Sequence, residues 1–383
     1  MNGFPRGRSA IVGAATFGIG EAPGFTSMDI AVNASIKALR QANLTPADVD
    51  ALFICLPGDF ISGLSFAEYL GIQPKITENN RTGGSAFLTH LAWAALALDA
   101  GLCDTALIAY GSNQRTAAGR LVSAAAPDPY EGVYKPRLPV GGYALAAARH
   151  MHEYGTTPEQ LAEVAVSARQ WANLNPDAFM QGDLTVDDVL SARRVATPLG
   201  VRDCCLVTDG GAAVVVTRAD RAKDLTAKPA FVLGSAAATF HMNIAMMPDL
   251  TVTAASESGP AAFAQAGVTH ADIDVCELYD AFSINPILFM EDLGFCPKGE
   301  GGRYFEGGRT APGGEMPVNT NGGGLSCVHP GMYSLFALVE AVEQVAGTAG
   351  ARQVEGVDVA LAHGNGGFLS SQVTAILGSG ATV

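Results

Sequence analysis

Three polar side chains in glycine-rich or acidic segments of the second half could carry proton-transfer chemistry. Tyr279 stands in the sequence ELYDAFS, His329 in NTNGGGLSCVHP, and His363 in AHGNGG. A tyrosine hydroxyl can donate to an oxyanion or exchange a proton, and an imidazole can do both. Each residue also has a structural interpretation: a packed aromatic at a strand end, a capping histidine in a turn, and a histidine that bonds the backbone.

The elements that must position these side chains alternate between strand-like and helical runs. Apolar strands without polar alternation, separated by helices of ten or more residues, predict a buried parallel or mixed sheet. In the first half we expect strands over 9–15, 51–56 and 105–110 and helices over 28–41 and 85–100.

The second half repeats the order of the first. The segment LTPADVDALF reappears as VTHADIDVCE, so that Asp48 and Asp50 correspond to Asp272 and Asp274 at a constant offset. Later, DTAL in the first half is echoed by DVAL in the second. Two matches in the same order predict an internal duplication, in which each half runs helix, turn, strand, glycine-rich loop, helix, strand.

Composition narrows the class of protein. The chain has 383 residues, of which 48% are hydrophobic and only 16% charged, so much of it must be interior or interface. Its formal net charge is −14, and no cluster of lysine or arginine interrupts that acidity. We therefore expect no nucleic-acid partner and no anionic membrane surface.

The seven cysteines are scattered and odd in number, which argues against a disulfide framework or a zinc ribbon. We expect no bound metal. The first residues contain no apolar signal segment, and the apolar stretch Thr82–Leu98 is interrupted by His90 and is short for a bilayer. We interpret that stretch as a buried helix and expect a cytoplasmic location.

The three segments that carry Tyr279, His329 and His363 resemble, in order and spacing, the catalytic loops of the thiolase superfamily. The likeness is greatest to the branch of sterol-carrier-protein-type thiolases and lipid-transfer-protein-like aldolases. It extends over nearly the whole chain, including DCCLVTDGGAA at Asp203–Ala213. The resemblance implies an α/β thiolase fold whose duplicated halves form a layered αβαβα architecture. It implies halves at 1–225 and 226–383, with an inserted loop region at about 112–199.

Thiolases use a thiolate at a helix N-terminus, where the helix dipole lowers the thiol pKa. Counting back from Gly101, which closes the predicted helix, places the nucleophile position at Gly84. Ser85 follows it, but a serine at a helix start is more often an N-cap than a nucleophile.

Three cysteines in other loops are the remaining candidates for a nucleophile. They are Cys204, Cys205 and Cys327, all in apolar contexts. Cys327 is the least implausible of them because it lies two residues from His329.

The resemblance assigns further roles residue by residue. His329 matches the histidine beside the nucleophile and the thioester carbonyl. Tyr279 stands where thiolases have an asparagine and related branches a histidine. His363 lies where many thiolases place a second catalytic cysteine, and could supply acid/base capacity instead. Asp280 is expected to fix its loop by hydrogen bonding.

Two glycines and one more tyrosine complete the expected site. Gly323 and Gly366 are expected to support the loops and the oxyanion site. Steroid side-chain aldolases of the same branch use tyrosines near the loops that carry Tyr279 and Tyr333. Tyr333 is therefore an acid/base candidate on the first turn of the next helix, and its structural alternative is packing on Phe336.

The preferred function is retro-aldol cleavage of a β-hydroxyacyl-CoA without a cysteine nucleophile. In this reaction a base takes the β-hydroxyl proton, and donors hold the thioester enolate. One alternative is acetyl-CoA acyltransferase (β-ketoacyl-CoA thiolase) chemistry, and another is a non-catalytic subunit that binds acyl-CoA. By resemblance we expect a coenzyme A thioester as substrate and no covalently bound cofactor. We also expect a homodimer, and a small zinc-ribbon/OB-fold protein as a possible partner.

Overall fold

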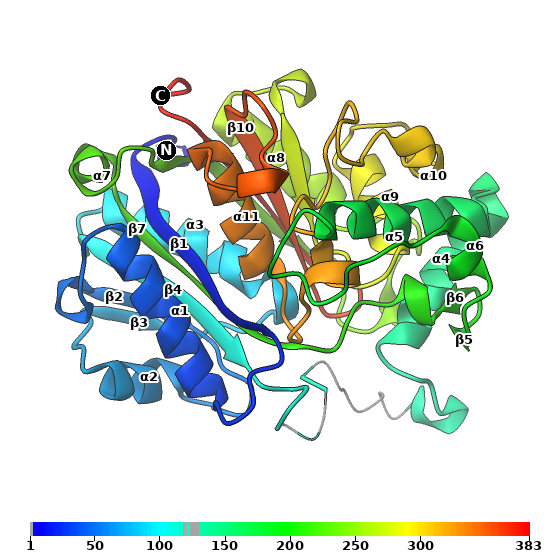
Figure 1. Ribbon diagram of the computed structural model, residues 1–383, viewed down its shortest axis with the longest axis horizontal. Helices are drawn as coiled ribbons and strands as arrows, with labels where there is room; N and C mark the ends of the chain where they lie inside the picture. The colour runs from blue at the N-terminus through cyan, green and yellow to red at the C-terminus, as the bar shows by residue number, and fades with distance from the viewer. Residues whose placement is uncertain (1–2, 118, 120, 123–129) are drawn as a thin grey trace.

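The computed structural model describes residues 3–117, 119, 121–122 and 130–383. Within these residues, nine strands form one mixed sheet in the order β3-β2-β4-β7-β1-β8-β11-β10-β9, and two short strands pair separately (Figure 1). The strands are β1 Ser9–Gly20, β2 Ala51–Ile54, β3 Ile76–Glu78, β4 Thr105–Ser112, β5 Arg194–Ala196, β6 Leu199–Gly200, β7 Asp209–Arg218, β8 Ala230–Thr239, β9 Val275–Leu278, β10 Val359–Gly366 and β11 Ser371–Gly378.

The α-helices in the described residues connect and cover these strands. They are α1 Ser27–Gln41, α2 Ser62–Leu70, α3 Ala86–Asp99, α4 Val140–Tyr154, α5 Pro158–Ala172, α6 Val186–Leu190, α7 Ala219–Leu225, α8 Ala255–Ala266, α9 Ile284–Asp292, α10 Gly301–Tyr304 and α11 Ser334–Ala346. The strands and helices predicted in the first half are confirmed to within a few residues at their ends. The exception is the first strand, which continues five residues beyond its expected end to Gly20.

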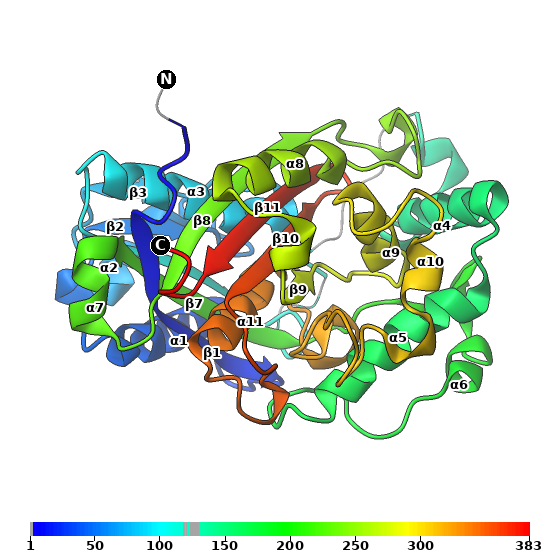
Figure 2. The ribbon, with the colours of Figure 1, turned by 90° about the horizontal axis from the view of Figure 1, so that it is seen from above.

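Two helices form the central layer of the molecule. α3 contacts β2, β4 and β7 of one half of the sheet and β8 and β10 of the other, and α11 likewise contacts both halves. α1 packs on β1, β4 and β7, while α8 packs on β8 and β11 (Figures 1 and 2). This confirms the layered αβαβα thiolase fold. The two expected sheets are joined edge to edge, because Ala10 pairs with Phe231 and Ile11 with Ala230.

Matching hydrogen bonds confirm the duplication. The backbone N–H of Thr45 donates to the Asp48 carboxylate at 2.8 Å, and that of Thr269 donates to the Asp272 carboxylate at 2.7 Å. In each half a short 3₁₀ turn follows the threonine and leads into a strand of the sheet. The repeated sequence therefore encodes a repeated turn.

The second pair of repeated aspartates has a repeated function as well. Asp50 accepts a hydrogen bond from the backbone N–H of Asp104 at 3.0 Å, and Asp274 accepts one from that of Asp358 at 2.8 Å. These bonds tie the strand after each turn to the start of β4 or β10. The register of both strand pairs is thereby fixed at the same edge of each half.

The segment between β4 and β7 contains α4, α5 and α6 together with the β5–β6 pair. Figure 1 shows these helices gathered on one side of the molecule, beside α9 and α10. The division of the chain after residue 225, with an insertion at about 112–199, remains a prediction. Among the residues that the structure describes, no helix has the length and apolar character needed to span a membrane.

Candidate active site

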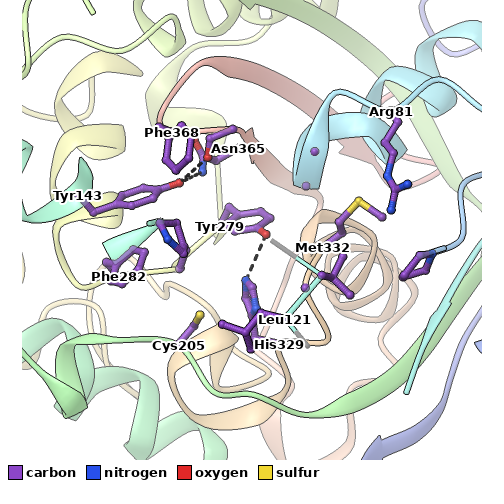
Figure 3. A pocket seen from close by; sticks show the side chains of 18 of the residues that line it. Arg81, Leu121, Tyr143, Cys205, Tyr279, Phe282, His329, Met332, Asn365 and Phe368 are labelled. Carbon is purple, nitrogen blue, oxygen red and sulfur yellow. Dashed lines mark hydrogen bonds between the residues drawn. The ribbon is translucent and has the colours of Figure 1, made fainter. Parts of the chain in front are cut away.

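A cavity of about 660 Å³ opens at the carboxyl ends of β9 and β10. These two strands are parallel neighbours, so both end at the same edge of the sheet. The turn before α3, the loop before α11 and the first turn of α4 also contribute to its wall (Figure 3). Side chains with polar or reactive groups that line it are Ser27, Arg81, Asn113, Tyr143, Cys205, Tyr279, His329 and Asn365.

Tyr279 and His329 form a hydrogen-bonded pair in this cavity. The hydroxyl of Tyr279 lies 3.1 Å from Nε2 of His329, and the two rings meet edge to face at 5.5 Å (Figure 3). Burial lowers the pKa of His329 to about 4 and raises the pKa of Tyr279 well above its ordinary value. Both groups are therefore neutral near pH 7. The pair can exchange a proton without a resident charge.

The backbone of His329 is held at both its N–H and its carbonyl. Its N–H donates to the Thr208 hydroxyl at 3.0 Å, and its carbonyl accepts from the side chain of Gln114 at 2.8 Å. The hydroxyl of Tyr110 donates to the carbonyl of Pro330 at 2.6 Å. These bonds come from β4, β7 and the segments beside them, so the first half of the chain positions a residue of the second.

Asp280 organises the glycine loop beside the cavity. Its buried carboxylate accepts hydrogen bonds from the backbone N–H of Gly324 at 2.5 Å and of Leu325 at 3.2 Å. Burial raises the pKa of Asp280 to about 7, and these two amides oppose the shift. A Cβ at Gly323 would stand 2.1 Å from the Asp280 carboxylate, so only glycine fits there.

Gly366 permits a close approach between the two halves. A Cβ at this position would stand 1.8 Å from the carbonyl oxygen of Thr82, just before the turn that leads into α3. The end of β10 can therefore lie against the start of α3 only because residue 366 lacks a side chain.

Gly84 lies in the turn Gly83–Ser85, which leads into α3. A Cβ at residue 84 would stand 2.2 Å from Cε2 of Tyr279 and 2.5 Å from its hydroxyl oxygen. Real side chains do not approach this closely, so the phenol of Tyr279 fills the space that a side chain at residue 84 would need. The tyrosine and the glycine are sterically complementary.

Tyr333 lies behind Tyr279 and does not line the cavity. Its hydroxyl donates to the side-chain oxygen of Asn321 at 2.9 Å, and its ring packs edge to face on Tyr279 at 5.6 Å. It also stacks on Phe336, as its structural interpretation predicted. It occupies the N-cap position of α11, and a backbone hydrogen bond from it to Tyr279 works against the burial that raises the tyrosine pKa.

His363 belongs to strand β10, not to the expected loop. The glycine-rich sequence around it pairs with β11 along its whole length, which makes it regular strand. The imidazole is fully buried outside the cavity lining, between Thr374 at 2.9 Å and Gln372 at 2.9 Å, and packs on Phe289. The structure does not bring His363 to Tyr279 and His329.

Comparison with known proteins places the chain in a family. Residues 236–379 match the family model "Thiolase C-terminal domain-like". The acetyl-CoA acetyltransferase of Methanothermobacter thermautotrophicus is 35% identical over 94% of this chain and 96% of its own length. The chain belongs to the thiolase superfamily.

Two further relatives of this thiolase-superfamily protein are aldolases by name. The steroid side-chain-cleaving aldolase of Thermomonospora curvata is 31% identical over 90% of this chain and 91% of its own length. The solved structure of the "Ltp2-ChsH2(DUF35) aldolase" superposes with a TM-score of 0.89 at 29% identity, over 98% of this chain and 99% of that one.

The groups considered as replacements for the thiolase nucleophile are placed as follows. Ser85 stands at the N-cap position of α3, but its hydroxyl bonds Ser371 at 3.0 Å and makes no capping bond to the helix. Cys327 is buried away from the cavity, whereas Cys205 lines it. Burial raises the pKa of Cys205 well above that of an ordinary thiol, which disfavours a thiolate. Cys204 does not line the cavity.

Five polar residues of the cavity escaped the sequence reasoning in this thiolase-superfamily chain: Ser27, Arg81, Asn113, Tyr143 and Asn365. Tyr143 comes from α4, in the segment without readable motifs, and Asn365 stands between two glycines of β10. No local spacing links them, because they are 222 positions apart. Among the described residues, no group of three or more histidine, cysteine, aspartate or glutamate side chains could hold a metal ion.

Proposed function

We propose that this protein is a carbon–carbon lyase that cleaves a β-hydroxyacyl-CoA by a retro-aldol reaction, with no covalent bond to the enzyme. The observation that carries the proposal is the exchange between residues 84 and 279. The phenol of Tyr279 fills the space in which a side chain at Gly84 would stand, and its hydroxyl lies 3.1 Å from Nε2 of His329. A proton-transferring group therefore stands where the superfamily places a thiol.

The reaction that we propose needs no nucleophile. The β-hydroxyl proton passes to the phenol oxygen of Tyr279 while the phenol proton passes to Nε2 of His329. The electrons of the O–H bond form the carbonyl of a ketone or aldehyde, and the bond between the α and β carbons breaks. Its electron pair becomes the thioester enolate, which recovers the proton at the α carbon through Tyr279. The products are a carbonyl compound and a shorter acyl-CoA.

The charge state of the pair supports this sequence. Burial favours neutral His329 and neutral Tyr279, so the imidazole can accept a proton near pH 7. Its positive charge would form only together with the negative charge of the enolate. The backbone of Tyr333 opposes the burial that raises the pKa of the phenol, which eases the loss of its proton to His329.

The names of the relatives support acyl-CoA chemistry, but they point to two different reactions. One relative is a steroid side-chain-cleaving aldolase, and another is an acetyl-CoA acetyltransferase. We prefer the aldol reaction because the acetyltransferase reaction of thiolases uses a thiolate, and residue 84 is glycine. The cysteine that lines the cavity, Cys205, has a thiol whose pKa is raised by burial.

A paired assay tests this proposal. The protein is incubated first with a panel of straight-chain, branched and aromatic β-hydroxyacyl-CoA thioesters, and then with the matching β-ketoacyl-CoA thioesters plus free CoA. We expect carbonyl products only from the β-hydroxy compounds, at a rate that thiol alkylation leaves unchanged. Efficient thiolysis of the β-keto compounds would overturn the aldolase assignment, and its loss on alkylation would favour the acyltransferase.

We also propose that the protein forms a homodimer through the outer edge of β3. This strand has β2 as its partner on one side only, since it ends the large sheet. Beside it, large apolar side chains at the start of α2 and just before it are exposed, with Phe60 at 92%, Ile61 at 51% and Leu64 at 61%. A second copy would cover both the strand edge and these side chains. Light scattering should give twice the chain mass for the wild type, and the chain mass for Phe60→Asp/Leu64→Glu.

A small partner protein is a further proposal. The similar aldolase structure is named for ChsH2(DUF35) together with Ltp2. We propose that a corresponding zinc-ribbon/OB-fold protein binds this chain. Co-expression with the product of a neighbouring gene of that type, followed by size exclusion, should give one complex. Separate elution at micromolar concentration would contradict the proposal.

A further inference from the structure

A second hydrogen-bonded pair, Tyr143 and Asn365, faces the same cavity as Tyr279 and His329 (Figure 3). The amide nitrogen of Asn365 lies 2.8 Å from the hydroxyl of Tyr143, which in turn lies 3.0 Å from the carbonyl oxygen of Gly367. Asn365 is 2% exposed and Tyr143 3% exposed. Two polar pairs thus share one pocket.

The Gly367 carbonyl, which ends this chain of hydrogen bonds, determines their direction. The carbonyl of Gly367 can only accept, so the hydroxyl proton of Tyr143 lies toward it. The phenol oxygen must therefore accept from Asn365, whose amide nitrogen is turned toward Tyr143. An amide nitrogen has two hydrogens, and the second one on Asn365 has no partner among the described residues. A buried N–H donor without a partner marks a place for a ligand acceptor.

A row of buried side chains holds the Asn365 amide in this orientation. The side-chain nitrogen of Gln372 donates to Oδ1 of Asn365 at 2.7 Å, and Nε2 of His363 lies 2.9 Å from Oε1 of Gln372. Nδ1 of His363 lies 2.9 Å from the Thr374 hydroxyl. Cross-strand register explains the row, because Asn365 pairs with Gln372 and His363 with Thr374 on β10 and β11.

The row positions groups and does not conduct protons. Burial lowers the pKa of His363 to about 4, so its ring is neutral and carries one N–H and one acceptor nitrogen. A neutral imidazole that donates through Nε2 leaves Gln372 only one way to turn its amide. That orientation then determines which atom of Asn365 faces the cavity. Amides do not relay protons readily, so the row acts through geometry.

The substrate that we propose has two oxygens that the reaction must treat differently. Tyr279 and His329 serve the β-oxygen, and the thioester oxygen, on which the negative charge develops, needs its own neutral donors. We propose that the Asn365 amide, with the Tyr143 hydroxyl beside it, binds the thioester oxygen and stabilises the enolate. His363 is then a positioning residue that acts through Gln372 and Asn365. This inference rests on the proposed function for its chemistry.

Burial raises the pKa of Tyr143 to about 12, while a hydrogen bond from Asn365 opposes the shift. The hydroxyl therefore stays protonated and can turn from Gly367 toward an oxyanion. Both donors are fixed dipoles, and a fixed dipole interacts more strongly with the enolate oxygen than with the oxygen of the neutral thioester. Preorganised neutral donors of this kind favour the enolate, where the negative charge is greater.

The test uses a ligand that cannot be cleaved. Propanoyl-CoA labelled with ¹³C at the thioester carbonyl lacks a β-hydroxyl, and its carbonyl stretch can be followed by isotope-edited infrared spectroscopy. In the wild-type protein we expect the stretch to move to lower wavenumber on binding. We expect this shift to be lost in Asn365→Leu and reduced in Tyr143→Phe. The control Tyr154→Phe, on the same helix but outside the cavity lining, should keep it.

The positioning role has its own readout. His363→Leu should reduce the shift, and His363→Gln, which keeps an N–H for Gln372, should restore part of it. In an Asn365→Leu background, His363→Leu should have no further effect. For cleavage of a β-hydroxyacyl-CoA, Asn365→Leu should lower kcat by about 10²–10³-fold, the range found for the loss of one oxyanion donor.

The outcomes separate this inference from the proposed function. An unchanged infrared shift in both Asn365→Leu and Tyr143→Phe would overturn the inference while leaving the lyase in place. A shift that depends on Asn365, in a protein that cleaves no β-hydroxyacyl-CoA, would support the thioester site and overturn the lyase. If propanoyl-CoA does not bind to the wild type, the inference fails, and the paired assay alone decides the lyase. If Asn365→Leu does not fold, Tyr143→Phe and the two His363 variants decide.

Discussion

The two central helices begin at the same cavity, but their starts contribute different things to it. The turn before α3 offers backbone and space, because Gly83 and Gly84 line the cavity there without side chains. The loop before α11 offers side chains, since it carries His329 and Met332 into the cavity. The duplicated fold thus gives two equivalent helix starts. The turn before α3 brings only glycines to the cavity, whereas the loop before α11 brings side chains to it.

The difference teaches how a change of chemistry can be accommodated in one fold. The ring of Tyr279 comes from the end of β9 and fits the space that Gly84 leaves at the start of α3. Its hydroxyl meets His329, and its phenol receives a backbone hydrogen bond from Tyr333 at the start of α11. A residue without a side chain at position 84 is therefore a steric condition for placing the Tyr279 phenol between the starts of α3 and α11.

The largest effect is expected from removing the hydroxyl that lies between the helix starts. Tyr279→Phe keeps the ring against Gly84 but should lower kcat for β-hydroxyacyl-CoA cleavage by about 10³-fold, within the usual range for a lost acid/base group. His329→Ala should have a similar effect, and the double variant little more than either, because the two act as one unit. Steady-state kinetics measures this. Effects that multiply would contradict a shared proton path.

A side chain at residue 84, before α3, should lower the free energy of unfolding. Gly84→Cys places a side chain within 2.2 Å of the Tyr279 ring and should destabilise the protein by about 1–3 kcal/mol. Denaturant unfolding measures the loss, and Tyr279→Ala in the same chain should recover part of it. Gly141→Ala is the matched control: nothing lies within 4 Å of its Cβ position on α4, so it should not destabilise. Equal loss in both glycine variants would refute steric exchange between residues 84 and 279.

Because Tyr279 and His329 are both neutral near pH 7, we expect activity to persist to unusually low pH. His329 has a pKa lowered to about 4, so it stays unprotonated until the pH falls to that region. The acidic limb of kcat/KM should therefore lie well below pH 6.5. The contribution of His329 to stability has the same sign: its imidazole binds a proton at higher pH in the unfolded chain than in the fold, so its contribution to the free energy of unfolding should fall as pH drops from about 6.5 to 4. Burial raises the pKa of Asp280 to about 7, so the profile is also recorded for Asp280→Asn. An acidic limb that stays near pH 6.5 in that variant would show that His329 is not buried as a neutral base.

The smallest effect is expected at Tyr333, which lies behind Tyr279 and His329. Tyr333→Phe removes a hydroxyl that bonds Asn321, while its ring still packs on Tyr279. Asn321 keeps a hydrogen bond from Gly323, so its oxygen stays satisfied. We expect kcat to fall less than 10-fold, with about 1 kcal/mol lost in unfolding experiments. A loss as large as that of Tyr279→Phe would return Tyr333 to the reacting groups.

Much of the fold could be predicted because the sequence repeats its structural signals. Asp50 and Asp274 each accept a backbone N–H just before the parallel neighbouring strand, β4 or β10, which is why they recur at a constant offset. The pairing of Tyr279 with His329 could be expected from the superfamily resemblance, since both lie in segments that match its loops. The sequence also predicts that glycine stands at the nucleophile position of the superfamily, residue 84.

The rest of the site depends on distant packing. The sequence places His363 in a glycine loop, but pairing with β11 makes its segment a strand and turns its ring away from the cavity lining. Tyr143 and Asn365 meet only because the fold brings the first turn of α4 to the end of β10. Tyr333 could be placed at the helix start, but its hydroxyl direction depends on Asn321. No single segment contains such information.

The central claim is that a phenol has replaced a covalent nucleophile. The most direct test is intact-protein mass spectrometry on samples quenched in acid during turnover of a β-hydroxyacyl-CoA. We predict the unmodified chain mass at every time point while carbonyl product accumulates. A transient mass increase equal to the acyl group, located on a cysteine or serine, would contradict the claim.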